Sequence, residues 1–414
     1  MDKTPEELYR ERLKRVEDTI QLKVPDRIPF VPHMGIFAAR YAGLSPTEAF
    51  YDSEKWLSAC KKAIVELEPD MYRATTYPGR ALEAVECKQM KWPGHGGPTN
   101  STYQYVEKEY MKAEEYDAFF NDPSDFLVRA YLPRIFGTLE PLQKLPPLPS
   151  LFINGFRGAT TSVVFAETEM AAAFASLYKA GMETRKYRAE MAVLDRDLRS
   201  LGFLNSTTGP NMHAPFDVVA SMLRGIRGVM LDMYRQPDNL LAMMDRILHI
   251  ELGEVARMKK DGFSPIHITL HFGADGFMSP KQFETFYWPG LKKLILALID
   301  QGITPCPFLE GDFTSRLHYF TELPKGKVLL YIAATDPVKA KEILGNTACI
   351  AGNVPVSLLQ SGTPVQVKEY SKKIIDVAGK GGGFIMSSRS VLDDADPELV
   401  KVWAKFTREY GCYK

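Results

Sequence analysis

The second half of the chain alternates short apolar segments with amphipathic helical segments, and this alternation constrains the fold more than any other feature. From about residue 205 onward, helical connectors separate apolar runs such as 266–272, 304–310 and 383–388. Short continuous apolar strands separated by helices are typical of a parallel sheet that is covered on both faces. About eight such strands can be counted when two near the start are included. The sequence therefore predicts a closed (β/α)8 TIM barrel.

We interpret residues 1–414 as one barrel domain with two additions. An N-terminal helix is expected within 1–27, and 88–110 is a predicted hairpin whose turn lies in the Gly, Pro and Asn cluster 93–101. No GxGxxG fingerprint opens a helix, which disfavours a dinucleotide-binding sheet. The motifs GxSxG, HExxH and the P-loop are also missing, so serine hydrolase, zincin and NTPase functions lack support.

The charge balance and the cysteine content limit the cellular compartments and the classes of partner that are expected for this protein. Lys and Arg together number 51, as do Asp and Glu, so no overall field attracts nucleic acid or an acidic membrane. The five cysteines are scattered without CxxC spacing, unlike a secreted disulfide framework. The first residues lack a signal-peptide pattern, and no run of about 18 apolar residues follows. We therefore expect a cytoplasmic protein with no nucleic-acid or membrane partner.

Polar residues at strand ends are the candidate site residues, because active sites of (β/α)8 barrels lie where the strands end. His271 and Glu310 end two predicted strands, and Cys349 lies in a third. Three mixed N, O and S ligands that leave one position open are typical of catalytic zinc, which makes these residues a candidate metal set. The alternatives remain open: a strand-end His is often a hydrogen-bonded structural residue, and a single Cys in an apolar strand is more often core than ligand.

Three further charged residues lie close to these strand ends. Asp312 follows Glu310 and is a candidate either for catalysis or for capping the next helix. Arg389 ends the last strand, where it would suit an anionic substrate group or a structural ion pair with a carboxylate such as Glu310. Arg316 is a candidate partner for these carboxylates or for substrate.

The front edge of the predicted barrel offers a possible binding surface for a flat organic molecule. His33, Tyr72 and Arg73 lie at the ends of the first two strands, and His95 lies in the hairpin. Aromatic and polar side chains together are typical of pockets for small organic ligands. We therefore take His33, Tyr72 and His95, with Arg316, as candidate substrate-binding residues.

Several segments carry a resemblance that spans most of the chain: DRIPFVP, GADGFMSPKQFETFYWPGLKKLI, PFLEGDFTSRL, LPKGKV, ACIAGNVPVSLLQSGTP and GGGFIMSS. Together they resemble the uroporphyrinogen decarboxylase superfamily, and within it the corrinoid-dependent methyltransferase branch. The resemblance implies a (β/α)8 barrel, in agreement with the strand count.

Two departures from the family patterns matter for function. Uroporphyrinogen decarboxylases carry an MRQAGR segment after the first strand that holds substrate carboxylates, and only Arg40 remains of it here. The thiol-activating methyltransferases use His-x-Cys on the strand that matches 304–310 and a further Cys near 389. This chain has Phe308-Leu309-Glu310 and Arg389 in those places. A carboxylate is a harder ligand than a thiolate and better suited to polarising an oxygen atom.

The resemblance thus implies the first methyltransferase of an O-demethylase system. Such an enzyme moves the methyl group of a methoxylated aromatic to Co(I) of a separate corrinoid protein. Glu310, with His271 and Cys349, would bind zinc or supply a proton to the ether oxygen, where charge develops on the leaving phenolate. The alternatives are a cofactor-free decarboxylase of an aromatic or tetrapyrrole acid and a non-catalytic role. The number of subunits is left open, with a homodimer as one option.

Overall fold

The structure, a computed structural model, describes residues 3–413 apart from 75, 154, 207–208 and 259–261. Its centre is a parallel sheet in which each strand pairs with the next one along the chain. The strands of this sheet are β4 (Met212–His213), β5 (Pro265–Leu270), β6 (Thr304–Leu309), β7 (Leu329–Ile332), β8 (Cys349–Val354) and β9 (Phe384–Ser388). Parallel pairing throughout agrees with the alternation of strands and helices in the sequence.

Three short segments complete the barrel: 29–31, 70–72 and 204–206. The first pairs in parallel with β9 at Met386, and the second hydrogen-bonds to the first. The second also pairs in parallel with the third at Asn205, and the third leads into β4. If the third segment and β4, into which it leads, are counted as one strand, eight strands form a closed ring, and the predicted (β/α)8 barrel is confirmed.

The helices around the barrel begin where the sequence places a capping residue before proline. Asp336, Thr363 and Asp396 each accept a hydrogen bond from backbone N–H groups of the first helical turn. Proline occupies the first helical position in each case, where its missing N–H costs nothing. The helices that they start are α16 (Pro337–Leu344), α18 (Pro364–Ile374) and α19 (Pro397–Tyr410).

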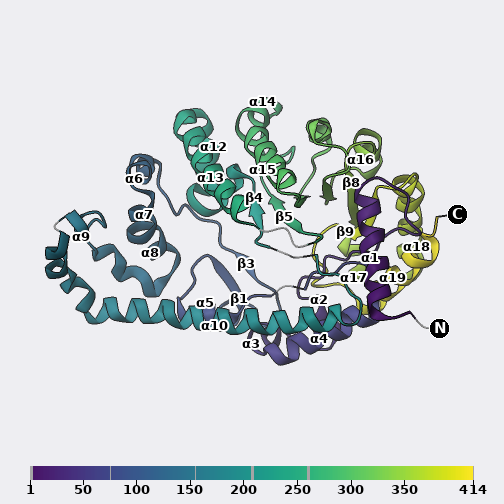
Figure 1. The fold of residues 1–414 in the computed structure, drawn as a ribbon, viewed down its shortest axis with the longest axis horizontal. Coiled ribbons are helices and arrows are strands. Elements are labelled where there is room, and N and C mark those ends of the chain that lie inside the picture. The colour runs from purple at the N-terminus through teal and green to yellow at the C-terminus, as the bar shows by residue number, and fades with distance from the viewer. Residues whose placement is uncertain (1–2, 75, 154, 207–208, 259–261, 414) are drawn as a thin grey trace.

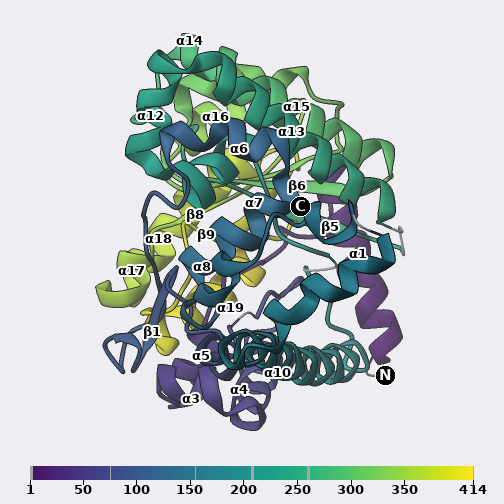
Figure 2. The same ribbon diagram turned by 90° about the vertical axis from the view of Figure 1, so that its left-hand side faces the viewer.

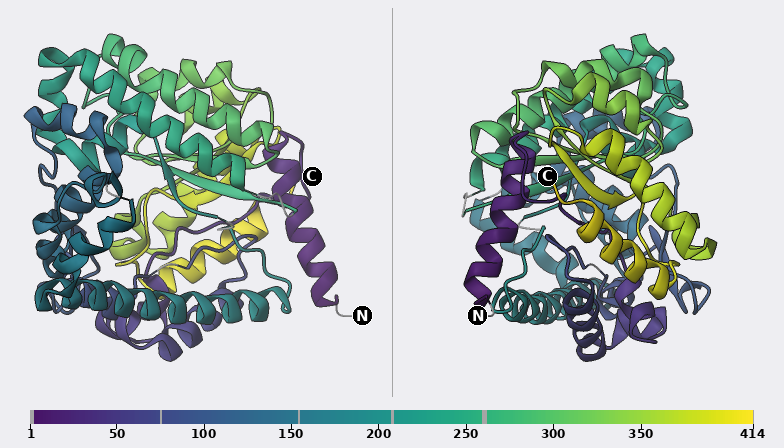
Figure 3. Two further views of the ribbon diagram at one scale, coloured as in Figure 1. Left: turned by 60° about the vertical axis from the view of Figure 1, so that its left-hand side comes forward. Right: turned by 90° about the vertical axis from the view of Figure 1, so that its right-hand side faces the viewer.

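Helices cover the outside of the sheet, as Figures 1 and 3 show. Besides those three, the cover consists of α11 (Pro215–Val218), α12 (Gly225–Arg235), α13 (Pro237–Arg257), α14 (Pro280–Gln282), α15 (Trp288–Asp300) and α17 (Val356–Ser361). Within the described part of the chain, no helix is both long enough and apolar enough to span a bilayer.

The first half of the chain adds helices beside the barrel between its first and third strand segments. After α2 (Phe37–Tyr41), the helical segment 46–67 is divided at Asp52 into α3 (Pro46–Tyr51) and α4 (Ser53–Leu67). Asp52 ends the first helix and caps the second, since its side chain accepts from the N–H of Lys55. The short helix α5 (Gly79–Ala84) then leads into the hairpin.

The predicted hairpin is present and lies beside the barrel. It comprises β1 (Met90–Pro93), β2 (Gly96–Gly97) and β3 (Gln104–Tyr105), with β1 and β3 antiparallel. An arm of helices follows, and it projects from the barrel (Figures 1 and 2). The arm contains α6 (Tyr116–Asn121), α7 (Pro123–Phe126), α8 (Leu132–Ile135), α9 (Ser150–Ile153) and the long α10 (Thr168–Arg199), which returns to pack on α4 and α5.

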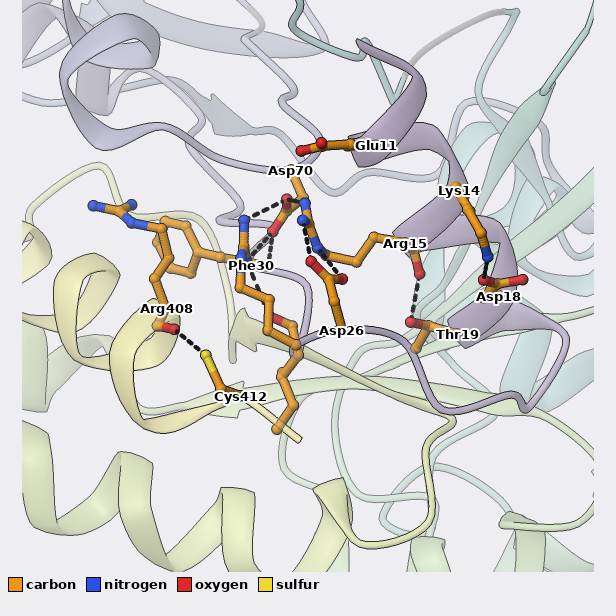
Figure 4. Close-up of polar contacts among 12 residues, drawn as sticks. Glu11, Lys14, Arg15, Asp18, Thr19, Asp26, Phe30, Asp70, Arg408 and Cys412 are labelled. Atoms are coloured by element: carbon orange, nitrogen blue, oxygen red, sulfur yellow. Dashed lines mark hydrogen bonds and ion pairs between the residues drawn. The ribbon is translucent and has the colours of Figure 1, made fainter. Parts of the chain in front are cut away.

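The N-terminal helix α1 (Pro5–Ile20) covers the N-terminal end of the barrel. Val16 and Ile20 pack against the interior residues Val31 and Met71. A buried carboxylate fixes this cover, because Asp70 accepts hydrogen bonds from Arg15 of α1 at 2.6 Å, from Arg27 at 2.7 Å and from the Phe30 N–H at 2.8 Å (Figure 4). Two guanidinium groups and an amide thereby compensate a charge that has no contact with water.

Alternate residues of each strand point into the barrel. The lower interior is filled by apolar and aromatic side chains that include Leu204, Cys306, Phe308, Leu329, Tyr331, Cys349, Ala351 and Ile385. Because α1 closes the bottom of this interior, the open end lies at the carboxyl ends of the strands.

Candidate active site

His271 and Glu310 meet at the carboxyl ends of two adjacent strands. Leu270 ends β5, Leu309 ends β6, and these two residues are paired in register, so the residues that follow them stand side by side. Nδ1 of His271 lies 2.7 Å from Oε2 of Glu310. Both side chains remain accessible, with 34% of His271 and 51% of Glu310 exposed. The pair therefore presents a polar edge to the open end of the barrel.

A buried carboxylate behind this pair positions His271. Asp217 of α11 accepts the backbone N–H of His271 at 2.9 Å and that of Phe272 at 3.0 Å. It also accepts the hydroxyl of Tyr287 at 2.7 Å. Asp217 is fully buried, so these three donors hold the start of the loop after β5 in one place.

The charges around His271 favour its protonated form. Burial lowers the pKa of His271, but the hydrogen bond to Glu310 and the charges of Asp217 and Glu310 outweigh it, so the pKa is raised. Burial raises the pKa of Asp217 to about 6, although His271 and the three donors oppose this shift. With Nδ1 on Glu310, the Nε2 atom of His271 is the one left to exchange a proton with a ligand.

A second histidine stands beside His271 and stays neutral. The rings of His213 and His271 are stacked, with centroids 6.2 Å apart. Burial and the neighbouring His271 lower the pKa of His213 to about 4. Its backbone N–H faces Glu251 of α13 at 3.5 Å, and burial raises the pKa of Glu251 to about 8. Two buried acids thus lie behind the two histidines.

An aromatic cluster fills the interior next to these groups. The ring of His33 stacks on Tyr331 with centroids 5.5 Å apart, and it meets Phe308 and His267 edge-on at 5.2 Å and 5.4 Å. Burial and the charge of Arg73 lower the pKa of His33 to about 3, so its ring is neutral. Its Nδ1 atom is buried without a hydrogen-bond partner in the described structure.

Two tyrosines from outside the strands complete the open end. Tyr77 follows the second strand segment and Tyr103 comes from the hairpin, and their rings meet edge-on at 4.8 Å. They are 38% and 41% exposed. Burial raises the pKa of Tyr103, and its interactions with Tyr77, Asp393 and Glu310 add to the shift. An aromatic ring entering the barrel would meet these tyrosines first.

Beside this opening lies a separate cavity of about 410 Å³. Its walls come from α2, the start of α3, the hairpin and the loop after β9, and they include Arg40, Asp393 and Asp394. Asp393 accepts the N–H of Ile36 at 2.8 Å. The loop can approach this closely because Gly35 has a φ of +54° and a Cβ there would lie 2.1 Å from the carboxylate.

Comparison with known proteins shows which protein family the barrel resembles. Residues 206–410 match the family model described as uroporphyrinogen decarboxylase (URO-D). The chain carries a URO-D family domain. The matched region runs from the end of the third strand segment through α19, so it holds Asp217, His271 and Glu310 but not Arg73 or Tyr103.

Curated relatives agree with this assignment over the same half. The uroporphyrinogen decarboxylases of Syntrophotalea carbinolica and Geotalea daltonii are 23% and 26% identical to the chain over 190 residues. These alignments cover 45% of this chain and 54% and 55% of the two relatives, so the chain spans about half of their length. A methyltransferase from Methanosarcina mazei has a similar fold over 96% of this chain and 98% of its own, with a TM-score of 0.61 and 16% identity.

The URO-D domain does not assemble the zinc set that the sequence suggested. Cys349 begins β8 and pairs with Leu329 at the beginning of β7, whereas His271 and Glu310 follow the last residues of their strands. The strand register puts Cys349 level with Cys306, which lies four residues before Glu310. At about 3.3 Å per residue, Cys349 therefore lies roughly 13 Å below the pair. Its side chain is fully buried in the apolar interior. The prediction that Cys349 joins this site is wrong, and the described residues contain no group of three or more His, Cys, Asp or Glu arranged to hold a metal.

Two charged candidates of the URO-D domain have structural roles. Asp312 accepts hydrogen bonds from the N–H and hydroxyl of Thr314, the first residue of the 3-10 helix Thr314–Glu322, whose N-cap residue is Phe313. Arg316 is fully buried and donates to the carbonyls of Gly273 and Met278. The prediction of Arg316 as a substrate-binding residue is wrong, because its guanidinium is enclosed by the loop after β5.

Two candidates from the first half of the chain also lie elsewhere. Tyr72 points away from the barrel interior, and its hydroxyl donates to Asp195 of α10 at 2.9 Å. His95 lies in the hairpin, stacked on Trp92, with its Nε2 atom 2.7 Å from Glu83. Neither residue contacts the His271–Glu310 pair, so both predictions of substrate binding are corrected.

The remaining candidate, Arg389, follows the last residue of β9. Its Nε atom is buried without a hydrogen-bond partner in the described structure. Its charge and hydrogen bond oppose the effect of burial on Tyr370 of α18, whose pKa is nevertheless raised. Arg389 therefore faces α18 and forms no ion pair with Glu310.

The sequence analysis missed the residues that support His271. Asp217 stands in the apolar segment HAPFDVV, and His213 begins it. A carboxylate inside an apolar run needs a partner, and that requirement is the signal that could have identified Asp217.

Proposed function

We propose that this protein is a methyltransferase that moves the methyl group of a methoxylated aromatic to the Co(I) atom of a separate corrinoid protein. The observation that carries the proposal is the His271–Glu310 pair at the open end of the barrel, where the pKa of His271 is raised. An aryl methyl ether leaves as a phenolate, which is a poor leaving group unless its oxygen is stabilised. A protonated imidazole is suited to that task near neutral pH.

Each residue of the site has a defined part in this reaction. The O–CH3 bond breaks, its electron pair stays on the oxygen, and the methyl group passes to the acceptor. His271 donates its Nε2 proton to that oxygen, so a neutral phenol leaves. Glu310 holds the imidazole through Nδ1, and Asp217 fixes the backbone from which the imidazole projects. Tyr77 and Tyr103 supply an aromatic surface for the arene.

Decarboxylation of an aromatic or tetrapyrrole acid is the second candidate function. The relatives named uroporphyrinogen decarboxylase support it, since the match includes the strands that hold His271 and Glu310. The fold shared with a methyltransferase from Methanosarcina mazei supports the first. In a decarboxylase the same imidazolium would protonate the carbanion that remains after CO2 leaves.

The acceptor distinguishes the two functions. We would incubate the protein with methoxybenzenes and methoxybenzoates, with and without a reduced corrinoid protein, and quantify phenol, methylated corrinoid and CO2. Methyl transfer requires the cobalt acceptor, and decarboxylation does not. His271→Gln should abolish the activity, and Asp312→Asn, which alters an exposed side chain that contacts Thr314, should preserve it. Release of CO2 without any corrinoid would overturn the proposal in favour of the decarboxylase.

A further inference from the structure

Arg73 carries a charge that nothing in the described structure neutralises. It follows the second strand segment and lines the barrel interior with His33, His267 and Tyr331. The groups that interact with it electrostatically are the hydroxyls of three tyrosines and the thiol of Cys306, and no carboxylate is among them. Burial lowers the pKa of Arg73, which reflects the cost of placing this cation in the barrel.

Two other arginines inside this molecule are compensated. Arg15 contacts Asp26 and Asp70, and Arg224 contacts Asp232. A guanidinium that is largely removed from water without an acidic partner is costly, because its hydration is lost and not replaced. Arg73 is therefore the inward-facing cation of the described barrel that lacks the anion its position calls for.

We propose that Arg73 binds the carboxylate of an aromatic acid whose methoxy group reaches the His271–Glu310 pair. The placement of the methoxy group rests on the proposed function, whereas the binding of a carboxylate by Arg73 does not. A planar guanidinium matches a carboxylate through two parallel hydrogen bonds. A phenol would be a poorer match near neutral pH, because it carries no charge there.

The neighbours of Arg73 provide the rest of the binding surface. The Nδ1 atom of His33 is buried and unpartnered, and Arg73 acts on this ring, so both groups face the same space. Tyr77 and Tyr103 also lie within the field of Arg73, and Tyr103 lies within that of Glu310. The two rings also meet edge-on at 4.8 Å, so they offer an aromatic surface that interacts with the cation.

The available space sets the direction of approach. The interior cavity that Arg73 lines has a volume of only about 10 Å³, roughly enough for one water molecule. An aromatic acid therefore cannot sink below Arg73. It has to enter from the open end, past the partly exposed Tyr77 and Tyr103, with its carboxylate leading.

Arg40 is the competing anion site. It lines the cavity of about 410 Å³, but Asp393 and Asp394 share that cavity and supply negative charge. An aromatic carboxylate would be repelled by those two groups. Arg40 therefore serves as the matched control for Arg73.

Equilibrium binding tests the proposal without any turnover. The dissociation constants of 4-methoxybenzoate and the neutral 4-methoxybenzyl alcohol would be measured by titration calorimetry on the full chain. We expect the acid to bind roughly 10- to 100-fold more tightly, the usual effect of hydrogen bonds to a charged group. Arg73→Gln should abolish this preference, Arg73→Lys should retain part of it, and Arg40→Gln should leave it intact.

The outcomes separate the two proposals. Equal binding of acid and alcohol by the unaltered protein overturns the carboxylate site, as does loss of the preference in Arg40→Gln but not in Arg73→Gln. If Arg73→Gln does not fold, the unaltered protein and Arg73→Lys decide the matter. A retained preference without methyl transfer to a corrinoid protein would reject the reaction and keep the binding site.

Discussion

Nδ1 of His271 and Oε2 of Glu310 lie 2.7 Å apart although 39 positions separate the two residues in the chain. The contact follows from the register of β5 and β6, in which Leu270 faces Leu309. A shift of one residue in that register would turn Glu310 out of the barrel and separate the pair. The chemistry of the site thus depends on strand pairing as much as on the two side chains.

Replacing Glu310 should lower the pKa of His271. Burial lowers this pKa, and the hydrogen bond to Glu310 and the negative charge of Glu310 raise it. In Glu310→Gln the charge is lost and the hydrogen bond is weaker, so the imidazole would lose its proton at lower pH. Activity needs the protonated form, and it should therefore decline as pH rises through the pKa of His271, at a lower pH in the variant. We expect a loss of about 100-fold or more near neutral pH, typical of an impaired general acid. NMR titration of His271 and the pH–rate profile would test this, and coincident profiles would contradict it.

Replacing Cys349 should leave the site intact. Because Cys349 lies in the apolar interior at the beginning of β8, Cys349→Ala should lower stability by about 1 kcal/mol and leave the turnover number unchanged. Elemental analysis of the unaltered protein and of this variant should give the same metal content. A stoichiometric metal that is lost in Cys349→Ala would restore the zinc hypothesis that the geometry disfavours.

Removing the buried carboxylate beneath the barrel should be costly. Asp70→Asn would leave Arg15 and Arg27 without their shared partner, and breaking a buried ion pair in this way costs about 3–5 kcal/mol. Denaturant-induced unfolding would measure the difference. The matched control is Glu11→Gln on α1, which breaks an exposed contact with Lys3 and should cost less than about 1 kcal/mol. Equal effects of the two changes would contradict the role assigned to Asp70.

Glu251 should make the stability depend on pH. Burial raises its folded-state pKa to about 8 from an ordinary value of 4.5, so the folded protein holds a proton that the unfolded chain has lost between these values. The contribution of Glu251 to the free energy of unfolding is therefore fully present below about pH 4.5 and is lost as the pH rises toward 8.

The variant Glu251→Gln carries no such proton. Its melting temperature should exceed that of the unaltered protein by at least about 2 °C at pH 9, and the gap should narrow toward pH 5. Glu254→Gln, an exposed position on the same helix, is the control and should show no pH-dependent gap. A constant gap for Glu251→Gln across this range would contradict the prediction.

The barrel could be predicted from sequence because apolar runs and amphipathic helices alternate at regular spacing. His271 and Glu310 could be found for a related reason, since each follows an apolar run that ends where a parallel strand ends. Cys349 was misplaced because a run of apolar letters does not show which of its ends faces the opening. Periodicity identifies a strand but not the height of a residue along the barrel axis.

Other residues depended on partners distant in the chain. Arg316 and Tyr72 look like exposed polar groups in sequence, yet each is buried against a segment that the sequence does not place near it. Asp217 contacts residues 54 and 70 positions away. The sequence shows only that such residues are charged or aromatic, and the fold determines whether they contact solvent, each other or a ligand.

The pairing of Phe30 with Met386 closes the barrel across 356 positions of the chain. On a ribosome, the first strand segment therefore waits for most of the polypeptide to be made before its partner in β9 exists. Until then its neighbouring edge has unpaired backbone groups that could recruit another chain. The seam between the first and last strands is thus the step at which a nascent chain of this protein is most exposed to misassembly, and a chaperone that shields this edge would act there.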